Sequence, residues 1–84
     1  MEIKVLGTGC PNCQRLEKNA KAALAQLGAQ AQVTKVTDMK AITSYDILST
    51  PGLVIDEKVV SSGRVPNVAE ITSLIATALA EAES

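Results

Sequence analysis

With 84 residues, the chain has the length of one compact domain, because two halves would each be too small to bury a core. Hydrophobic residues make up 46% and charged residues 20% of the sequence, which excludes a disordered chain and predicts a single globular domain over residues 1–84. The net charge of −1 comes from interspersed acids and bases, so we expect no nucleic-acid partner and no membrane partner. The absence of histidine excludes catalysis or metal binding through imidazole.

The N-terminal half of the chain predicts a strand, a helix and a second strand. Residues 2–6 form a short apolar run that ends at glycine, as a buried strand does where it reaches a loop. From Cys13 onward, apolar residues recur at steps of three and four until Gly28, which predicts a helix that begins at the cysteine motif. Apolar and polar residues then alternate around Val33 and become irregular at Lys35, which indicates a strand. The strands of such a βαβ unit are expected to be parallel.

A short helix and a hairpin are predicted next. Asp38 is placed to cap the short helix. Three residues then lead toward the next strand: Tyr45, Ile47 and Leu48. Residues 53–55 and 58–61 are rich in β-branched side chains and are expected to pair as an antiparallel hairpin. The turn between them, Asp56-Glu57, lacks the glycine expected of a tight two-residue loop.

The last helix has the clearest pattern. Asn67, followed three residues later by Glu70, resembles a capping box. An apolar stripe at helical spacing follows it: Val68, Ile71, Leu74, Ile75, Ala78 and Leu79. The element order β-α-β-α-β-β-α predicts an α/β fold in which helices cover a central sheet. Met39 and Tyr45 are expected to pack in the core and to have no functional role.

The motif Cys10-Pro11-Asn12-Cys13 is the candidate active site. Two cysteines are too few to staple a secreted mini-protein, so their spacing indicates chemistry rather than scaffolding. A helix N-terminus stabilises a thiolate, and Pro11 suits the first helical turn. We therefore predict that Cys10 is the nucleophile, with a pKa lowered mainly by the helix N-terminus, and that the less exposed Cys13 is the resolving thiol.

Two other functions would use the same cysteine pair. A soft-metal carrier would hold Cu(I) or another thiophilic ion between both thiolates. Metal carriers with this spacing resemble βαββαβ domains and usually have Met two residues before the first cysteine, where this chain has Thr8. A redox-sensing binding module would share both the fold and the cysteines, so the sequence does not separate it from a reductase.

A second motif joins the cysteines in one resemblance. On its own, Pro51 at the mouth of a core strand marks either an ordinary strand start or a cis peptide bond. Nearly the whole chain resembles the small thioredoxin-like redox-active disulfide proteins of archaea and bacteria. Three stretches carry the resemblance: GTGCPNC at 7–13, STPGLVID at 49–56 and KVVSSGRVP at 58–66. The resemblance implies a thioredoxin-like fold, with a four-stranded mixed sheet flanked by three helices. It also implies the activity of a thiol-disulfide oxidoreductase of the protein-disulfide reductase type.

The resemblance also assigns residues around the cysteines. It implies a cis peptide bond between Thr50 and Pro51, with the Thr50 backbone offered to an extended substrate segment and Pro51 shaping the groove and keeping metals from the thiols. The active-site loop is completed by three residues: Gly9, Pro11 and Asn12. Gly9 stands where larger thioredoxins have an aromatic residue. The strand predicted at residues 2–6 carries Lys4 but no acid in its apolar middle that could accept a proton from Cys13.

The expected cofactors and partners follow from these assignments. We expect no cofactor other than the redox-active Cys10–Cys13 disulfide, and no metal. The expected partners are disulfide-containing protein or small-molecule substrates and a thioredoxin-reductase-like electron donor, and the chain is expected to be a monomer. The first residues lack a cationic start followed by a long apolar run, which predicts a cytoplasmic protein.

Overall fold

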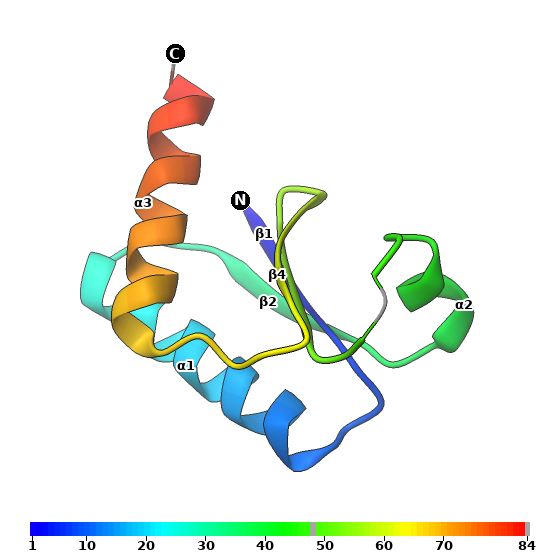
Figure 1. The fold of residues 1–84 in the computed structure, drawn as a ribbon. Helices are drawn as coiled ribbons and strands as arrows, with labels where there is room; N and C mark the ends of the chain where they lie inside the picture. The colour runs from blue at the N-terminus through cyan, green and yellow to red at the C-terminus, as the bar shows by residue number, and fades with distance from the viewer. Residues whose placement is uncertain (48, 84) are drawn as a thin grey trace.

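A computed structural model describes residues 1–47 and 49–83, so Leu48, predicted to lead into a strand, lies outside the described residues. The described elements follow in the predicted order (Figure 1): β1 (Glu2–Leu6), α1 (Pro11–Leu27), β2 (Gln32–Val36), α2 (Met39–Thr43), β3 (Gly52–Ile55), β4 (Lys58–Ser62) and α3 (Val68–Glu83). The predicted α/β class and element order are confirmed.

The strands form one mixed sheet in the order β2-β1-β3-β4. β1 pairs in parallel with β2, as predicted for the βαβ unit, and antiparallel with β3. β3 and β4 form the predicted antiparallel hairpin, with a register shift between Leu53 and Val54. β2 continues regularly to Val36, which pairs with Leu6, although the sequence pattern becomes irregular there. The central strand β1 therefore leads directly into the cysteine loop.

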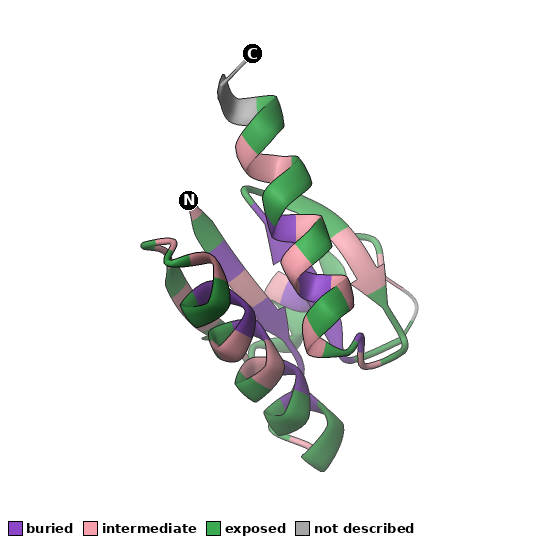
Figure 2. Cartoon of the chain, turned by 90° about the vertical axis from the view of Figure 1, so that its left-hand side faces the viewer, coloured by how far each residue is buried: buried purple, intermediate pink, exposed green. Residues whose placement is uncertain are grey.

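Alternation along β1 divides the core between the two faces of the sheet. Ile3 and Val5 pack with buried residues of β3, α1 and α3, whereas Leu6 packs with Val54 and with Ile42 of α2. Helices α1 and α3 therefore cover one face of the sheet and α2 covers the other (Figure 1). Figure 2 shows the buried positions of α1, α3 and the sheet facing one another.

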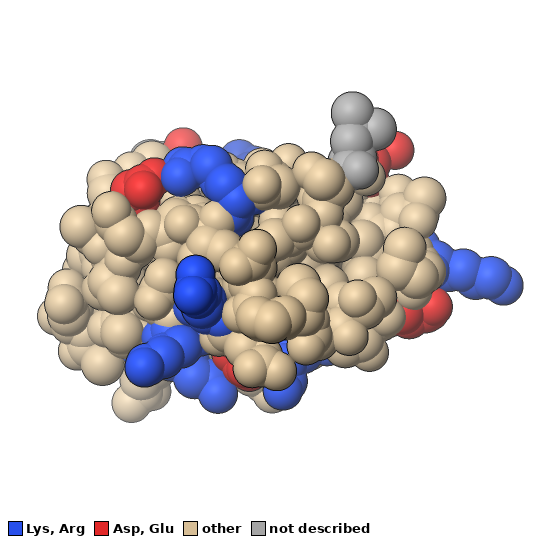
Figure 3. Space-filling model, turned by 60° about the horizontal axis from the view of Figure 1, so that its bottom comes forward, with Lys and Arg blue, Asp and Glu red and all other residues tan. Residues whose placement is uncertain are grey.

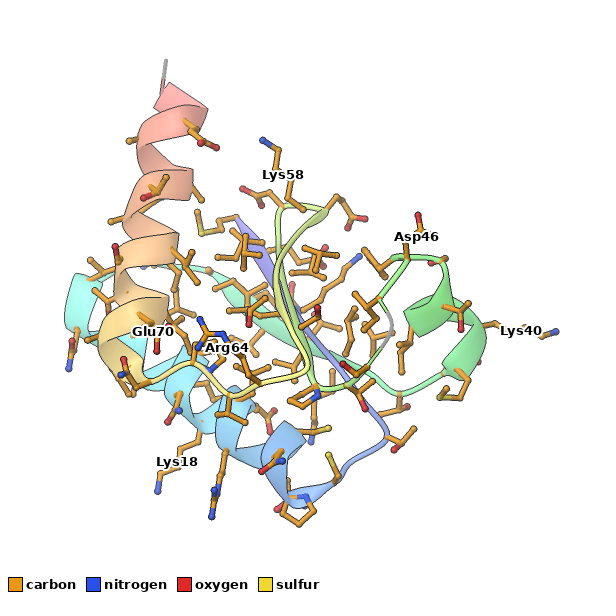
Figure 4. The ribbon with its side chains drawn as sticks, viewed as in Figure 1. Lys18, Lys40, Asp46, Lys58, Arg64 and Glu70 are labelled. Carbon is orange, nitrogen blue, oxygen red and sulfur yellow. The ribbon has the colours of Figure 1, made fainter. Side chains whose placement is uncertain are left out.

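The helix boundaries are set by the predicted caps. The Asp38 side chain accepts a hydrogen bond from the Lys40 backbone N–H at 3.2 Å, and Gly28 ends α1 with a φ of 63°. At α3, the Asn67 side chain accepts from the Glu70 N–H at 2.8 Å, and Glu70 accepts in return from the Asn67 N–H at 3.5 Å. Glu70 also pairs with Arg64 at 2.6 Å, and the two side chains lie side by side in Figure 4.

The hairpin turn uses positive φ angles without glycine. Asp56 has a φ of 48° and Glu57 a φ of 69°, the signs that a type I′ turn requires at both central residues. The Asp56 carboxylate accepts from the Glu2 N–H at 2.9 Å, and the Glu57 carboxylate accepts from Lys4 at 2.5 Å and from the Tyr45 hydroxyl at 3.1 Å. These bonds tie the turn to β1 and to the segment that follows α2, and they compensate for the missing glycine.

The core prediction for Met39 is wrong, whereas Tyr45 packs partly as expected. Met39 is 57% exposed, because α2 spans only five residues and turns Ile42 toward the sheet instead. Tyr45 packs against the cluster of Leu6, Ile42 and Val54, and its hydroxyl also accepts a hydrogen bond from Lys4 at 2.9 Å.

Candidate active site

The two cysteines lie at the start of α1 in different environments. Cys10 is the N-cap residue, half-buried, and Pro11 is the first helical residue. Cys13, one turn further, is buried, with 5% of its surface exposed. The Cys13 backbone N–H donates to Cys10 Sγ at 3.4 Å, and the two Sγ atoms lie 2.6 Å apart and share a hydrogen bond. The pair is therefore a dithiol with one accessible and one covered sulfur.

The pKa values of the two thiols shift in opposite directions. The pKa of Cys10 is lowered, first by the hydrogen bond from the Cys13 thiol and then by the Cys13 backbone N–H. The pKa of Cys13 is raised, first by burial and then by its hydrogen bond to Cys10. The direction for Cys10 agrees with the sequence prediction. The largest single cause is the hydrogen bond with the neighbouring thiol, and backbone N–H groups at the start of the helix add to it. The hydrogen bond between the sulfurs thus favours the thiolate at Cys10 and the protonated thiol at Cys13.

The loop before β3 meets the cysteines at the end of β1. The Thr50–Pro51 peptide bond is cis, with Thr50 exposed and Pro51 buried. A Cβ atom built on Gly7 would lie 4.0 Å from the Thr50 Cβ and would overlap Cys13 Sγ. Gly7 therefore lies close to both Cys13 and Thr50, so two motifs that are far apart in the sequence meet here.

The remaining loop residues surround Cys10 on the surface. Gly9, Pro11 and Asn12 are exposed, and Gly9 has a φ of 92° that favours glycine. The Gly9 carbonyl accepts from the Gln14 side chain at 3.4 Å. The predicted site residues thus lie in one region, with the loop on the outside and Cys13 beneath it.

A shallow hollow beside Thr50 was not predicted from the sequence. It has a volume of about 180 Å³ and lies between α2 and the loop before β3. Its lining combines apolar side chains with hydroxyls: Met39, Ile42, Thr43, Ile47, Ser49 and Thr50. Met39, the exposed apolar residue at the start of α2, forms part of this rim.

Lys4 has a structural environment of its own. Its ammonium group donates to Tyr45 and to Glu57, and its pKa is raised first by the Glu57 hydrogen bond. Among the causes that shift the pKa of Cys13, none is an acidic side chain. The acid of β1, Glu2, lies at the start of the strand, away from the cysteine loop that follows Leu6, and forms an ion pair with Lys4.

Neither a metal cluster nor a spanning helix is found in the described part of the chain. No group of three or more His, Cys, Asp or Glu residues there could hold a metal ion. Over residues 1–47 and 49–83, no helix combines the length and the apolar character needed to cross a membrane. The element order also differs from the βαββαβ order of the copper-type carriers.

Comparisons with known proteins agree with this geometry. The family described as "Thioredoxin domain" matches residues 1–76. A thioredoxin of Methanocaldococcus jannaschii is 41% identical over 69 residues, which cover 82% of this chain and 79% of the relative. A thioredoxin of Methanothermobacter thermautotrophicus is 40% identical over 75 residues, which cover 89% of this chain and 97% of the relative. The chain therefore belongs to the thioredoxin domain family and is a thiol-disulfide oxidoreductase with a thioredoxin-like fold.

Proposed function

We propose that the chain is a disulfide reductase in which Cys10 attacks the substrate and Cys13 resolves the mixed disulfide. This assignment is based on the different exposure and pKa of the Cys10 and Cys13 sulfurs, which lie 2.6 Å apart. Cys10 is the more exposed and has the lowered pKa, whereas Cys13 is buried and has the raised pKa. Since the thiolate is the attacking species, the first attack falls to Cys10.

The reaction proceeds in two exchanges. The Cys10 thiolate attacks one sulfur of the substrate disulfide, and the other substrate sulfur leaves as a thiolate that takes a proton from water. Cys13 then loses its proton to water, and its sulfur bonds to Cys10 Sγ and displaces the second substrate thiolate. The dithiol loses two electrons and becomes the Cys10–Cys13 disulfide, while the substrate disulfide becomes two thiols. A thioredoxin-reductase-like donor returns the two electrons.

The substrate is proposed to bind along the loop that carries Thr50 and Pro51. Thr50 offers its backbone to an extended segment, and Pro51 shapes the groove beside the sulfurs. The hollow of about 180 Å³ beside Thr50 receives an apolar side chain that neighbours the substrate cysteine. The face that holds the start of α1 is mostly uncharged, with separate Lys and Arg side chains (Figure 3). Such a surface suits a protein substrate that docks by shape and apolar contact rather than by charge.

The wider setting follows the sequence expectations. Residues 1–84 are proposed to act as one domain and as a monomer. The cytoplasm is the proposed compartment, since its reducing pool keeps an exposed dithiol reduced. Protein disulfides are the proposed substrates, with small-molecule disulfides as the second class.

Reduction of insulin by the protein, with dithiothreitol as the electron source, tests the assignment. The wild-type chain is expected to accelerate the reaction, whereas Cys10→Ser is expected to be no faster than dithiothreitol alone. Cys13→Ser is expected to accumulate a mixed disulfide with the substrate, visible as a mass increase on Cys10. A Cys10→Ser variant that keeps the wild-type rate would contradict the proposal. A wild-type pair that oxidises once but does not turn over would instead favour the redox-sensing role.

A further inference from the structure

The backbone conformation at position 7 does not require a glycine. It lies at the end of β1, and its N–H donates to the Val36 carbonyl at 3.0 Å, which extends the β1–β2 ladder by one residue. Its φ is not positive, unlike those of Gly9, Gly28 and Gly63. An alanine could adopt this conformation without the penalty that side chains meet in the left-handed region. The reason for a glycine here is therefore the space beside it.

That space is filled by the sulfur of Cys13. A Cβ on residue 7 would overlap Cys13 Sγ and would lie 3.3 Å from the Cys13 Cβ. Little room remains for the sulfur to yield, because Cys13 is 5% exposed and the Thr50 Cβ lies 4.0 Å from the same position. The next buried residue of α1, Leu16, is 0% exposed, so the helix that carries Cys13 is anchored in the core.

We propose that Gly7 is a positioning residue for the resolving step, and that its missing side chain leaves the place that Cys13 Sγ occupies beside Cys10 Sγ. This inference rests on the proposed roles of the two cysteines. A side chain at position 7 would displace the Cys13 sulfur from its place 2.6 Å from Cys10 Sγ. It would leave Cys10 at the helix N-cap, where the first attack takes place.

Two-phase reaction of the reduced protein with Ellman's reagent separates these steps. The first release of thionitrobenzoate reports the attack by Cys10, and the second reports displacement of the mixed disulfide by Cys13. Gly7→Ala is expected to slow the second release by about tenfold or more, because an error of about 1 Å in the position of a reacting atom is that costly. The first release is expected to slow less than the second, because Cys10 keeps its backbone N–H donors and loses only the hydrogen bond from the Cys13 thiol.

Gly28→Ala is the matched control. It introduces the same methyl group at the far end of α1, where a Cβ meets nothing within 4 Å but where the φ of 63° makes alanine unfavourable. The control therefore loses stability through its backbone without touching either sulfur. Its two release rates are expected to keep the wild-type ratio. A Gly7→Ala variant that also keeps the wild-type ratio would overturn the proposal.

A double-mutant cycle measured by thermal unfolding tests the same contact without using the reaction. Gly7→Ala is expected to lower the Tm less in a Cys13→Ala background, because the atom it overlaps has been removed. If Gly7→Ala alone does not fold, the double variant Gly7→Ala/Cys13→Ala is expected to fold. Equal losses of Tm in both backgrounds, or a double variant that also fails to fold, would contradict the inference. The thermal-unfolding cycle tests the contact between Gly7 and Cys13 even if the chain does not reduce disulfides.

Discussion

The two ends of the β1–β3 pair are held together in different ways. At one end, near the top of Figure 1, the hairpin turn is fixed by carboxylates: Asp56 accepts from the Glu2 backbone N–H, and Glu57 accepts from Lys4 and Tyr45. At the other end, where α1 begins, the Cys10 thiol is hydrogen-bonded to the sulfur of Cys13.

The hairpin end therefore contributes to the stability of the fold, whereas the cysteine end carries the reactive groups. The hairpin partners are permanent parts of the fold, whereas the partner of Cys10 is a thiol that, in the proposed function, is also the second reactant. A substrate sulfur can therefore replace one contact at the cysteine end without disturbing the turn. Substitutions at three positions can break or sharpen this contrast.

Cys13→Ala is expected to have the largest effect, confined to the cysteine end. It removes the thiol that contributes most to lowering the pKa of Cys10, but the backbone N–H donors remain. The pKa of Cys10 should therefore rise toward the ordinary thiol value of 9.0 without necessarily reaching it. Each unit of increase reduces the thiolate fraction at lower pH about tenfold. The pH dependence of iodoacetamide alkylation measures this shift, and an unchanged profile would show that the Cys13 thiol does not stabilise the Cys10 anion.

Substitutions at Glu57 probe the hairpin end. Glu57→Ala loses the carboxylate that binds Lys4 and Tyr45 and keeps an L-residue at a φ of 69°, so its Tm should fall. Glu57→Gly loses the same carboxylate but accepts that φ, so it should melt a few degrees above the alanine variant. Both variants should keep the wild-type alkylation rate at Cys10. Altered cysteine reactivity, or an alanine variant that is the more stable, would break the separation between the two ends.

Ser61→Ala should have the smallest effect. The Ser61 hydroxyl oxygen on β4 is buried and has no hydrogen-bond partner among the residues that the structure describes. Its removal should leave the free energy of unfolding unchanged or raise it by up to about 1 kcal/mol. Thr72→Ser is a matched control, because it keeps the hydroxyl that donates to the Val68 carbonyl at 2.7 Å. Chemical denaturation compares the variants, and a clear loss of stability in Ser61→Ala would mean that this hydroxyl is hydrogen-bonded.

Local patterns were sufficient to predict most of the fold. Asp38, Gly28 and the Asn67–Glu70 pair are capping signals that act within a few residues, and the structure uses each of them. Hydrophobic periodicity fixed the long helices for the same reason, since it depends only on neighbouring turns. The predicted placement of Cys10 at the start of α1 follows from this local information and is confirmed.

Long-range contacts account for what the sequence did not predict. The turn at Asp56-Glu57 is stabilised by hydrogen bonds from β1 and from Tyr45, which follows α2. The sequence of the turn itself gives no sign of these distant partners. The leading role of the Cys13 thiol in lowering the pKa of Cys10 depends on the side-chain geometry of the helix start. The space beside Gly7 becomes visible only when the end of β1 is packed against α1.

Limited alkylation of the reduced wild-type protein across a pH series is the most direct test of the unequal sulfurs. The thiolate is the reacting form, so a lowered pKa moves the rise in rate to lower pH and a raised pKa moves it to higher pH. Mass spectrometry should find the label on Cys10 first, with an apparent pKa below the ordinary thiol value. Cys13 should react only at higher pH or after unfolding. Labelling of Cys13 first, or of both cysteines at the same rate, would contradict the account.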